Sequence, residues 1–239
     1  MNRNDWLAAR RRAAEAAFDT RYAPTYDEDD PPTSETHRRF VNLLLDRCPA
    51  DGLVLDAACG TGKYFGLVLD AGRRPFGVDQ SAGMLARAAA KFPDVPLHKS
   101  ALQDLDVGAG FDAAMCVDAM ENVPPEDWPL VLERLVRAVG RGGGLYVTVE
   151  CTDPQRLAAA YTEAGEQGLP VVVGEDARRG GGYHHYPALD RVRGWLRDAG
   201  VTDVLEAHSL GDHPSYSYHH FLGVVGPRAG ARSGTGPPG

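Results

Sequence analysis

Short apolar runs alternate with helical segments between positions 53 and 150 of the chain. Each run spans four to seven residues and is almost continuously apolar, which is the pattern of parallel strands that are covered on both faces. The expected strands are Leu53–Ala57, Pro75–Val78, Val95–His98, Phe111–Val117 and Gly144–Glu150, and the expected helices are Lys63–Ala71, Ala82–Lys91 and Trp128–Val139. This alternation predicts an α/β protein with a doubly wound, mostly parallel sheet, in which ligands bind outside the carboxyl ends of the strands.

The first 50 residues have a different pattern and are expected to form a helical cap. Apolar side chains at helical spacing predict an amphipathic helix over Asp5–Phe18. A second helix is expected to run to about Cys48, with Thr33 or Ser34 as its N-cap. Between the two helices, the acidic run at 27–30 and two prolines predict a loop whose charges are simply solvated.

The pattern is less regular after Glu150, and the segment 151–187 is expected to be an insertion before the last helix. Within it, 154–167 has a helical pattern, and the helix that follows the insertion is expected at 188–199. Two further strands, Thr202–His208 and Tyr216–Val225, complete a seven-stranded sheet in a domain that spans 51–226. The segment 227–239 is rich in Gly, Pro and Ser and is expected to be disordered.

Charge and cysteine content narrow the classes of function. A formal net charge of −8 argues against a nucleic-acid partner, because phosphate binding needs a basic surface. No run approaches the roughly 18 consecutive apolar residues that cross a membrane, and the arginine-rich N-terminus lacks the apolar stretch of a signal peptide, so we expect a cytoplasmic protein without a membrane partner. The four cysteines lie far apart and form no C-x-x-C pair, which indicates buried thiols rather than disulfides or a zinc site.

The most informative segment is a glycine turn between the first strand and the helix after it. Residues 56–64 read Asp-Ala-Ala-Cys-Gly-Thr-Gly-Lys-Tyr, and small residues at such a turn let a ligand approach the backbone. A Walker loop would need Gly where Ala57 stands and Ser or Thr where Tyr64 stands. A dinucleotide fingerprint read from Gly60 places the bulky Phe65 at its third glycine, so a nicotinamide enzyme is also disfavoured.

What remains fits a nucleoside without a pyrophosphate. Asp79 ends the second expected strand, 23 residues after Asp56, where a carboxylate can accept both ribose hydroxyls. This combination resembles the class I S-adenosylmethionine-dependent methyltransferases, whose first motif is an acidic residue followed by a turn of small residues. The segment 56–62 follows that motif with Ala58 in place of its first glycine. The resemblance implies a Rossmann-like fold and S-adenosyl-L-methionine as the methyl donor.

Three further motifs of the family follow in order. The segment 77–85 resembles the second motif, 111–123 resembles the fourth, whose strand end faces the sulfonium, and 141–145 resembles the glycine turn before the fifth strand. Residues just past the third strand would line the adenine pocket. The donor-binding residues that the resemblance implies are Tyr26, Asp56, Ala58, Cys59, Gly60, Thr61, Gly62, Asp79, Gln80, Met84, Ser100, Ala101, Leu102, Val117, Asp118 and Met120.

The methyl acceptor is expected to bind above the carboxyl ends of the strands, where the cap, the loop after the fourth strand and the insertion meet. Its candidate binding residues are Tyr22, Asn122, Tyr183, His184, Tyr186 and Tyr218. One group is favoured as a general base, with His185 and His213 first and Glu121 next, while packing or surface histidines remain an equal alternative. Six of the eight histidines lie between His184 and His220, but their spacing does not favour a metal site.

These observations predict methyl transfer to a small organic acceptor, in a monomer or homodimer. Oxygen is the favoured acceptor atom, with nitrogen or carbon as alternatives. A second class of reaction, in which the charged donor assists a cyclisation or another non-transfer step, stays open, as does a protein that binds the donor without turnover. A nucleic-acid or protein methyltransferase ranks lower, because Glu121-Asn122-Val123-Pro124 stands where base or glutamine methyltransferases have Asn or Asp followed by Pro-Pro and an aromatic residue.

Overall fold

A computed structural model describes residues 2–29, 33–177, 182–211 and 216–226 of the chain. The terminal segment 227–239, for which the sequence predicts disorder, lies outside these residues. Among the helices that the structure describes, none is long and apolar enough to cross a membrane.

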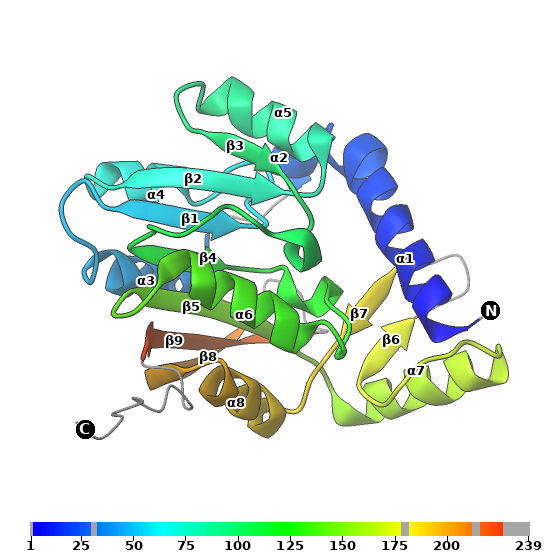
Figure 1. Ribbon diagram of the computed structural model, residues 1–239. Helices are drawn as coiled ribbons and strands as arrows, with labels where there is room; N and C mark the ends of the chain where they lie inside the picture. Colours follow the sequence, from blue (N-terminus) through cyan, green and yellow to red (C-terminus); the bar gives the residue numbers. More distant parts are fainter. Residues whose placement is uncertain (1, 30–32, 178–181, 212–215, 227–239) are drawn as a thin grey trace, which may run out of the picture.

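One seven-stranded sheet organises the molecule, in the order β3-β2-β1-β4-β5-β9-β8 (Figure 1). The first five strands pair in parallel, and β9 runs antiparallel to both β5 and β8. This confirms the Rossmann-like, doubly wound sheet. Its strands are β1 (Leu53–Ala57), β2 (Arg74–Asp79), β3 (Leu97–Lys99), β4 (Ala113–Cys116), β5 (Gly144–Cys151), β8 (Val201–Leu210) and β9 (Ser217–Val225).

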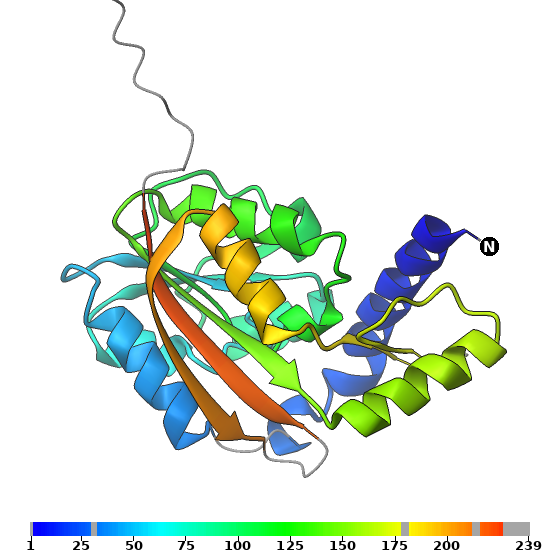
Figure 2. The same ribbon diagram turned by 90° about the horizontal axis from the view of Figure 1, so that it is seen from below.

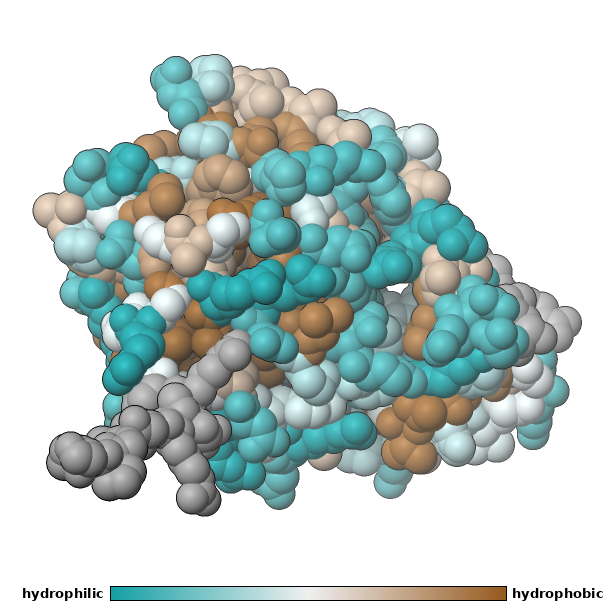
Figure 3. Space-filling view, in the orientation of Figure 1, coloured by the Kyte–Doolittle hydropathy of each residue, from teal (hydrophilic) through white to brown (hydrophobic). Residues whose placement is uncertain are grey.

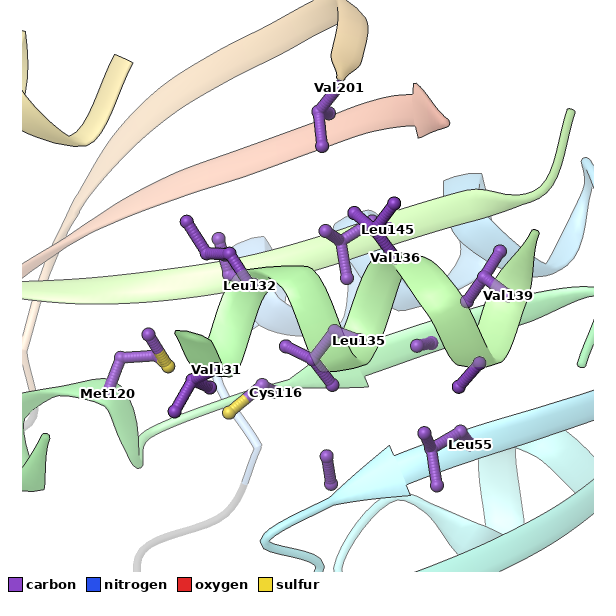
Figure 4. Packing of buried hydrophobic residues seen from close by; sticks show 14 of the residues in the cluster. Leu55, Cys116, Met120, Val131, Leu132, Leu135, Val136, Val139, Leu145 and Val201 are labelled. Carbon is purple, nitrogen blue, oxygen red and sulfur yellow. The ribbon is translucent and has the colours of Figure 1, made fainter. Parts of the chain in front are cut away.

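Helices cover both faces of the sheet, because successive side chains of each strand point to opposite faces. In β1, Leu55 belongs to the hydrophobic core that also contains α6 (Trp128–Val139) and α8 (Leu189–Asp198), and Figure 4 shows it on the side of the sheet that α6 covers. Its neighbour Val54 packs on the other side with α3 (Glu35–Leu45) and α4 (Phe65–Asp70). The helix α5 (Ala82–Lys91) packs on β2 and β3. Because helices cover both faces of the sheet, a ligand-binding site is expected at the ends of the strands.

The segments outside the sheet differ most from the sequence prediction. The helix α1 (Arg3–Ala17) continues into five residues of π-helix, η1 (Phe18–Tyr22), and a short helix α2 (Tyr26–Asp29) replaces part of the expected loop. The insertion forms α7 (Pro154–Glu166) and an unpredicted antiparallel hairpin of β6 (Glu175–Ala177) and β7 (Tyr183–His185). Three-residue strands that carry Glu, Asp and His show no alternation of apolar and polar residues that would reveal them.

The helix α1 and the insertion pack together as a lobe beside the carboxyl ends of the parallel strands (Figures 1 and 2). Trp6 of α1 forms a small apolar cluster with Ala177 and Tyr183, and its ring meets that of Tyr183 edge to face at 5.8 Å. Two segments that are far apart in the sequence thereby share one apolar core.

A buried ion pair fastens this lobe. Glu175 of β6 is fully buried and accepts hydrogen bonds from both terminal nitrogens of Arg3, at 2.7 and 3.0 Å. The Glu175 carboxylate also accepts a hydrogen bond from the Tyr183 hydroxyl. A terminal nitrogen of Arg3 donates a further hydrogen bond to the Glu126 carboxylate at 2.9 Å. The charge of Glu175 is therefore balanced by one cation from the other segment of the lobe.

We expect Arg3→Ala to loosen the lobe, because it leaves the buried Glu175 carboxylate without its cation. Loss of one partner of a buried pair costs about 3–5 kcal/mol. Hydrogen exchange should become faster in α1, β6 and β7 while the sheet is unchanged. Arg12→Ala, at an exposed position of α1, is the matched control. Unchanged exchange of the lobe in Arg3→Ala would contradict this account of the ion pair.

Candidate active site

The glycine turn after β1 has the left-handed backbone conformations that small residues permit. Ala58, Gly60 and Gly62 have φ angles of 67°, 53° and 80°. A side chain at Gly60 would meet nothing within 4 Å, so the backbone is open to a ligand there. Ala58 adopts a conformation that costs an L-residue about 1 kcal/mol, so the substitution of the motif's first glycine is accommodated at a cost in strain.

Asp79, the last residue of β2, holds this turn in place. One carboxylate oxygen accepts a hydrogen bond from the Gly60 N–H at 2.9 Å, and the other accepts one from the Ser81 N–H at 2.8 Å. Burial raises the pKa of Asp79, and these two hydrogen bonds oppose that rise. A carboxylate offers about four acceptor positions, so each oxygen can still accept a ribose hydroxyl.

Asp56 of β1 lies deeper, and only 1% of its surface is exposed. Its Oδ2 atom has no hydrogen-bond partner among the described residues. Burial, with the nearby charges of Asp79 and Asp118, raises the pKa of Asp56 to about 8. A buried acceptor without a donor, beside an open glycine turn, fits a ligand that carries a positive charge or an N–H group.

Two carboxylates of the N-terminal segment hold the cap on the domain, Asp27 at the glycine turn and Asp19 at the start of α5. Asp27 accepts hydrogen bonds from Thr61 at 2.5 Å and from Lys91 at 2.7 Å. Asp19 accepts one from Ser81 at 2.6 Å and one from the Gly83 N–H at 3.0 Å. The prediction that the acidic run is simply solvated is therefore wrong for Asp27. The hydrophobic pattern could not reveal these long-range contacts.

The structure brings most of the predicted donor-binding residues to one edge of the sheet. Gln80, Ser100 and Ala101 line a pocket of about 340 Å³ together with Arg11 and Arg12 of α1. The predicted donor-binding residues that pack inward instead are Cys59, Met84, Leu102, Val117 and Met120. Met120 points into the core beside α6, as Figure 4 shows, so only its backbone can face a donor.

The two cap tyrosines have different surroundings. Tyr26 lies in α2 and is half-buried, next to Asp27, which contacts the glycine turn. Tyr22 is 43% exposed, and its ring lies 5.3 Å from that of Phe18 within the same segment. The predicted contact of Tyr22 with an acceptor stays a prediction.

Asp118 follows β4 in a left-handed conformation, with φ of 53°, and is held from two sides. Its backbone N–H donates to Thr148 Oγ1 at 2.7 Å, and its Oδ1 atom lies 3.0 Å from His37 Nε2. Because an ionised carboxylate only accepts hydrogen bonds, His37 Nε2 is the donor to Asp118, and the Ser34 hydroxyl lies 2.6 Å from the other ring nitrogen, Nδ1. His37 and Thr148 were missed, because neither stands near a recognisable motif.

Two buried carboxyl groups lie beyond Asp118. Glu121, in the short helix η3 (Met120–Asn122), accepts a hydrogen bond from Asn122 at 2.9 Å through Oε1. The Oε2 atoms of Glu121 and of Glu150 in β5 have no hydrogen-bond partner in the described part of the chain. Burial and the mutual repulsion of the two groups raise the pKa of Glu121, and burial with the charge of Asp118 raises that of Glu150 to about 7. Glu150 was not predicted.

The histidines of β7 point to opposite faces of the hairpin. His184 Nδ1 lies 3.7 Å from Glu150 and 3.2 Å from the Tyr186 hydroxyl. His185 instead lies with its ring 6.2 Å from that of Trp128 and 6.4 Å from that of Trp195. Burial lowers the pKa of His185 to about 4. This placement argues against His185 as the base, because its ring packs between two helices.

Of the remaining residues predicted for the acceptor side, some lie near Glu150 and others do not. Tyr186 and Tyr218 lie near Glu150, and burial together with the charge of Glu150 raises the pKa of both. Tyr183 is engaged with Glu175 in the lobe. His213 lies outside the described residues. Within the described residues, no group of three or more His, Cys, Asp or Glu side chains is arranged to hold a metal ion.

Comparison with known proteins agrees with this geometry. Residues 54–143 match a family model described as a methyltransferase domain. The chain is 36% identical over 183 residues to dTDP-3-amino-3,6-dideoxy-alpha-D-glucopyranose N,N-dimethyltransferase from Streptomyces fradiae, covering 73% of this chain and 70% of the relative. It is 29% identical over 204 residues to demethylmenaquinone methyltransferase from Renibacterium salmoninarum, covering 79% and 84%.

Solved structures share the fold. Magnesium protoporphyrin IX methyltransferase from Synechocystis, crystallised with bound SAH, superposes with a TM-score of 0.63 at 17% identity, over 89% of this chain and 97% of that one. The unpartnered oxygen of Asp56 and the open turn at Gly60 fit the donor that such proteins bind. On this evidence the chain belongs to the class I S-adenosylmethionine-dependent methyltransferases.

Proposed function

We propose that this methyltransferase transfers the methyl group to a small organic acceptor that binds between the ends of β4 and β5, η3 and the insertion. The sulfonium of the donor supplies an electrophilic methyl group. The chain's own task is to hold an acceptor atom in line with the S–CH₃ bond and to exclude water. In the space-filling view an opening separates the body of the sheet from the lobe at this side of the molecule (Figure 3).

The observation that carries the proposal is the position of Asp118. It follows β4, which pairs with the strand of Asp56 (β1) on one side and with the strand of Glu150 (β5) on the other. Its charge acts on Asp56 and also on Glu121 and Glu150. The donor site and the two unpartnered carboxyls are therefore neighbours, with Asp118 between them. This is the arrangement that a two-substrate transfer needs.

The proposal also concerns which atom of the acceptor receives the methyl group. The sequence favours oxygen, and the carboxyl groups of Glu121 and Glu150 can accept a proton either from a hydroxyl or from an ammonium group. Relatives include a magnesium-protoporphyrin O-methyltransferase and N,N-dimethyltransferases of amino sugars. A net charge of −8 supports a small acceptor over a nucleic acid.

Asp79→Asn tests the donor site. The substitution removes the charge and turns an N–H₂ group toward one of the two backbone N–H donors, so we expect S-adenosylhomocysteine to bind about 10- to 100-fold more weakly, or about 1.5–3 kcal/mol. Isothermal titration calorimetry measures the affinity. Asp70→Asn, at the exposed end of α4, is the matched control. Unchanged affinity in Asp79→Asn would remove the basis of the proposed function.

The raised pKa of Asp56 predicts that donor binding releases a proton. With a pKa of about 8, its carboxyl is mostly protonated at pH 7, and a bound cation favours the ionised form. Binding at pH 7 should therefore release a proton, and donor affinity should rise with pH through the pKa of Asp56 at about 8 and level off above it.

Calorimetry in phosphate and in Tris, which differ in ionisation enthalpy, counts the released protons. Asp56→Asn should remove most of the difference between the two buffers, whereas Asp70→Asn should retain it. A wild-type binding enthalpy that is the same in both buffers would contradict the role of Asp56.

A further inference from the structure

The end of the sheet beyond the donor site gathers three carboxyl groups. Asp118 follows β4, Glu121 lies in η3, and Glu150 lies near the end of β5. The Glu121 and Glu150 residues are only 6% and 7% exposed, and each leaves one buried oxygen without a hydrogen-bond partner in the described chain. Buried oxygens of this kind are costly unless a ligand or a proton satisfies them.

The basic groups that act on Glu150 do not offset its burial. One is the guanidinium of Arg156 on α7, which also forms an ion pair with Asp176 of β6 at 3.7 Å. It lowers the pKa of Glu150, yet burial and the charge of Asp118 outweigh it and the pKa stays raised to about 7. His184 faces Glu150 at 3.7 Å, but burial lowers the pKa of His184 and so disfavours its charged form.

Aromatic side chains border the same place. Tyr218 of β9 is 7% exposed, and all three carboxylates contribute to raising its pKa. Its ring meets that of His37 edge to face at 4.8 Å. Tyr186 contributes a second ring and a hydroxyl next to His184 and Glu150. Electron-rich faces beside carboxylates favour a cation over a neutral ligand.

The identity of the ligand follows from the number and charge of these acceptors. A hydroxyl donates one hydrogen bond and leaves the carboxylate charges unbalanced, whereas an ammonium group donates up to three and also neutralises a charge. We propose that the methyl acceptor is an amine, bound as its ammonium ion by the buried pair of Glu121 and Glu150, with Asp118 at the approach to them. This inference rests on the proposed function, because it names the acceptor class of the same site.

The carboxyl pair also provides the proton acceptor that such a reaction requires. The ammonium gives one proton to a carboxylate of the Glu121–Glu150 pair, which leaves a neutral nitrogen with a free lone pair. That lone pair forms the N–CH₃ bond while the S–CH₃ bond of the donor breaks with its electrons on sulfur. The proton then passes from the carboxyl group to water, so atoms and charge balance.

Within this site, His37 and Thr148 act as positioning residues. They hold Asp118 Oδ1 at 3.0 and 3.4 Å. The Asp118 side chain is 29% exposed, which makes it the most reachable carboxylate of the three. Asp118 therefore lies at the solvent-accessible side of the proposed site, and Glu121 and Glu150 lie at its buried side.

The test compares two ligands of nearly the same shape. Calorimetry on protein saturated with S-adenosylhomocysteine measures the binding of benzylamine, which is a cation at pH 8, and of benzyl alcohol, which is neutral. We expect benzylamine to bind at least about tenfold more tightly than benzyl alcohol, because a charge-assisted hydrogen bond contributes that much to the affinity. The Glu121→Gln/Glu150→Gln double variant should lose this preference, and Glu150→Gln alone should reduce it.

Glu166→Gln is the matched control, because Glu166 is exposed on α7 of the same insertion. Its preference for benzylamine should equal that of the wild type. Equal affinity of the wild type for the two ligands, no binding of benzylamine, or a preference that survives in the double variant would each overturn the inference. Failure of S-adenosylhomocysteine itself to bind is a separate result, since it would contradict the proposed function.

Discussion

The structure depends on one electrostatic constraint, which is the burial of several carboxyl groups at a single edge of a parallel sheet. Asp56, Asp79, Asp118 and Glu150 come from four neighbouring strands, and the fold places all four strand ends together. Burial raises the pKa of three of these groups. In a medium of low polarity the unpaired charges cost free energy, so the edge favours protons when it is empty and cationic ligands when they are present.

Two separate sets of contacts hold the elements around this edge in place. The N-terminal cap uses Asp19 and Asp27 to hold the turn and α5, while α1 and the insertion close on one another through Arg3 and Glu175. Both arrangements join segments that are distant in the sequence. The lobe can therefore bring His184 and Tyr186 beside Glu150 without interrupting the sheet.

The sequence predicts the sheet well because parallel strands buried on both faces leave continuous apolar runs, and the bounds expected for α5 and α6 agree with the structure. The turn and Asp79 were found for a related reason, since a tight turn restricts residue type and spacing. The surroundings of Asp118 and Glu150, where we propose that the acceptor binds, were predicted less well. Glu150 lies inside an apolar strand, His37 lies 81 residues from Asp118, and His184 differs from His185 only by the face of a strand whose register the sequence does not reveal.

The most direct test of this account is a pH titration of the aspartate and glutamate carboxyl groups by carbon-13 NMR, without ligand and with S-adenosylmethionine. The account predicts that Asp56 titrates near pH 8 in the free protein and at a distinctly lower pH in the complex, because the donor's positive charges favour its ionised form. If Asp56 titrates near its ordinary value of about 4 in the free protein, the buried edge carries no such constraint and the account is contradicted.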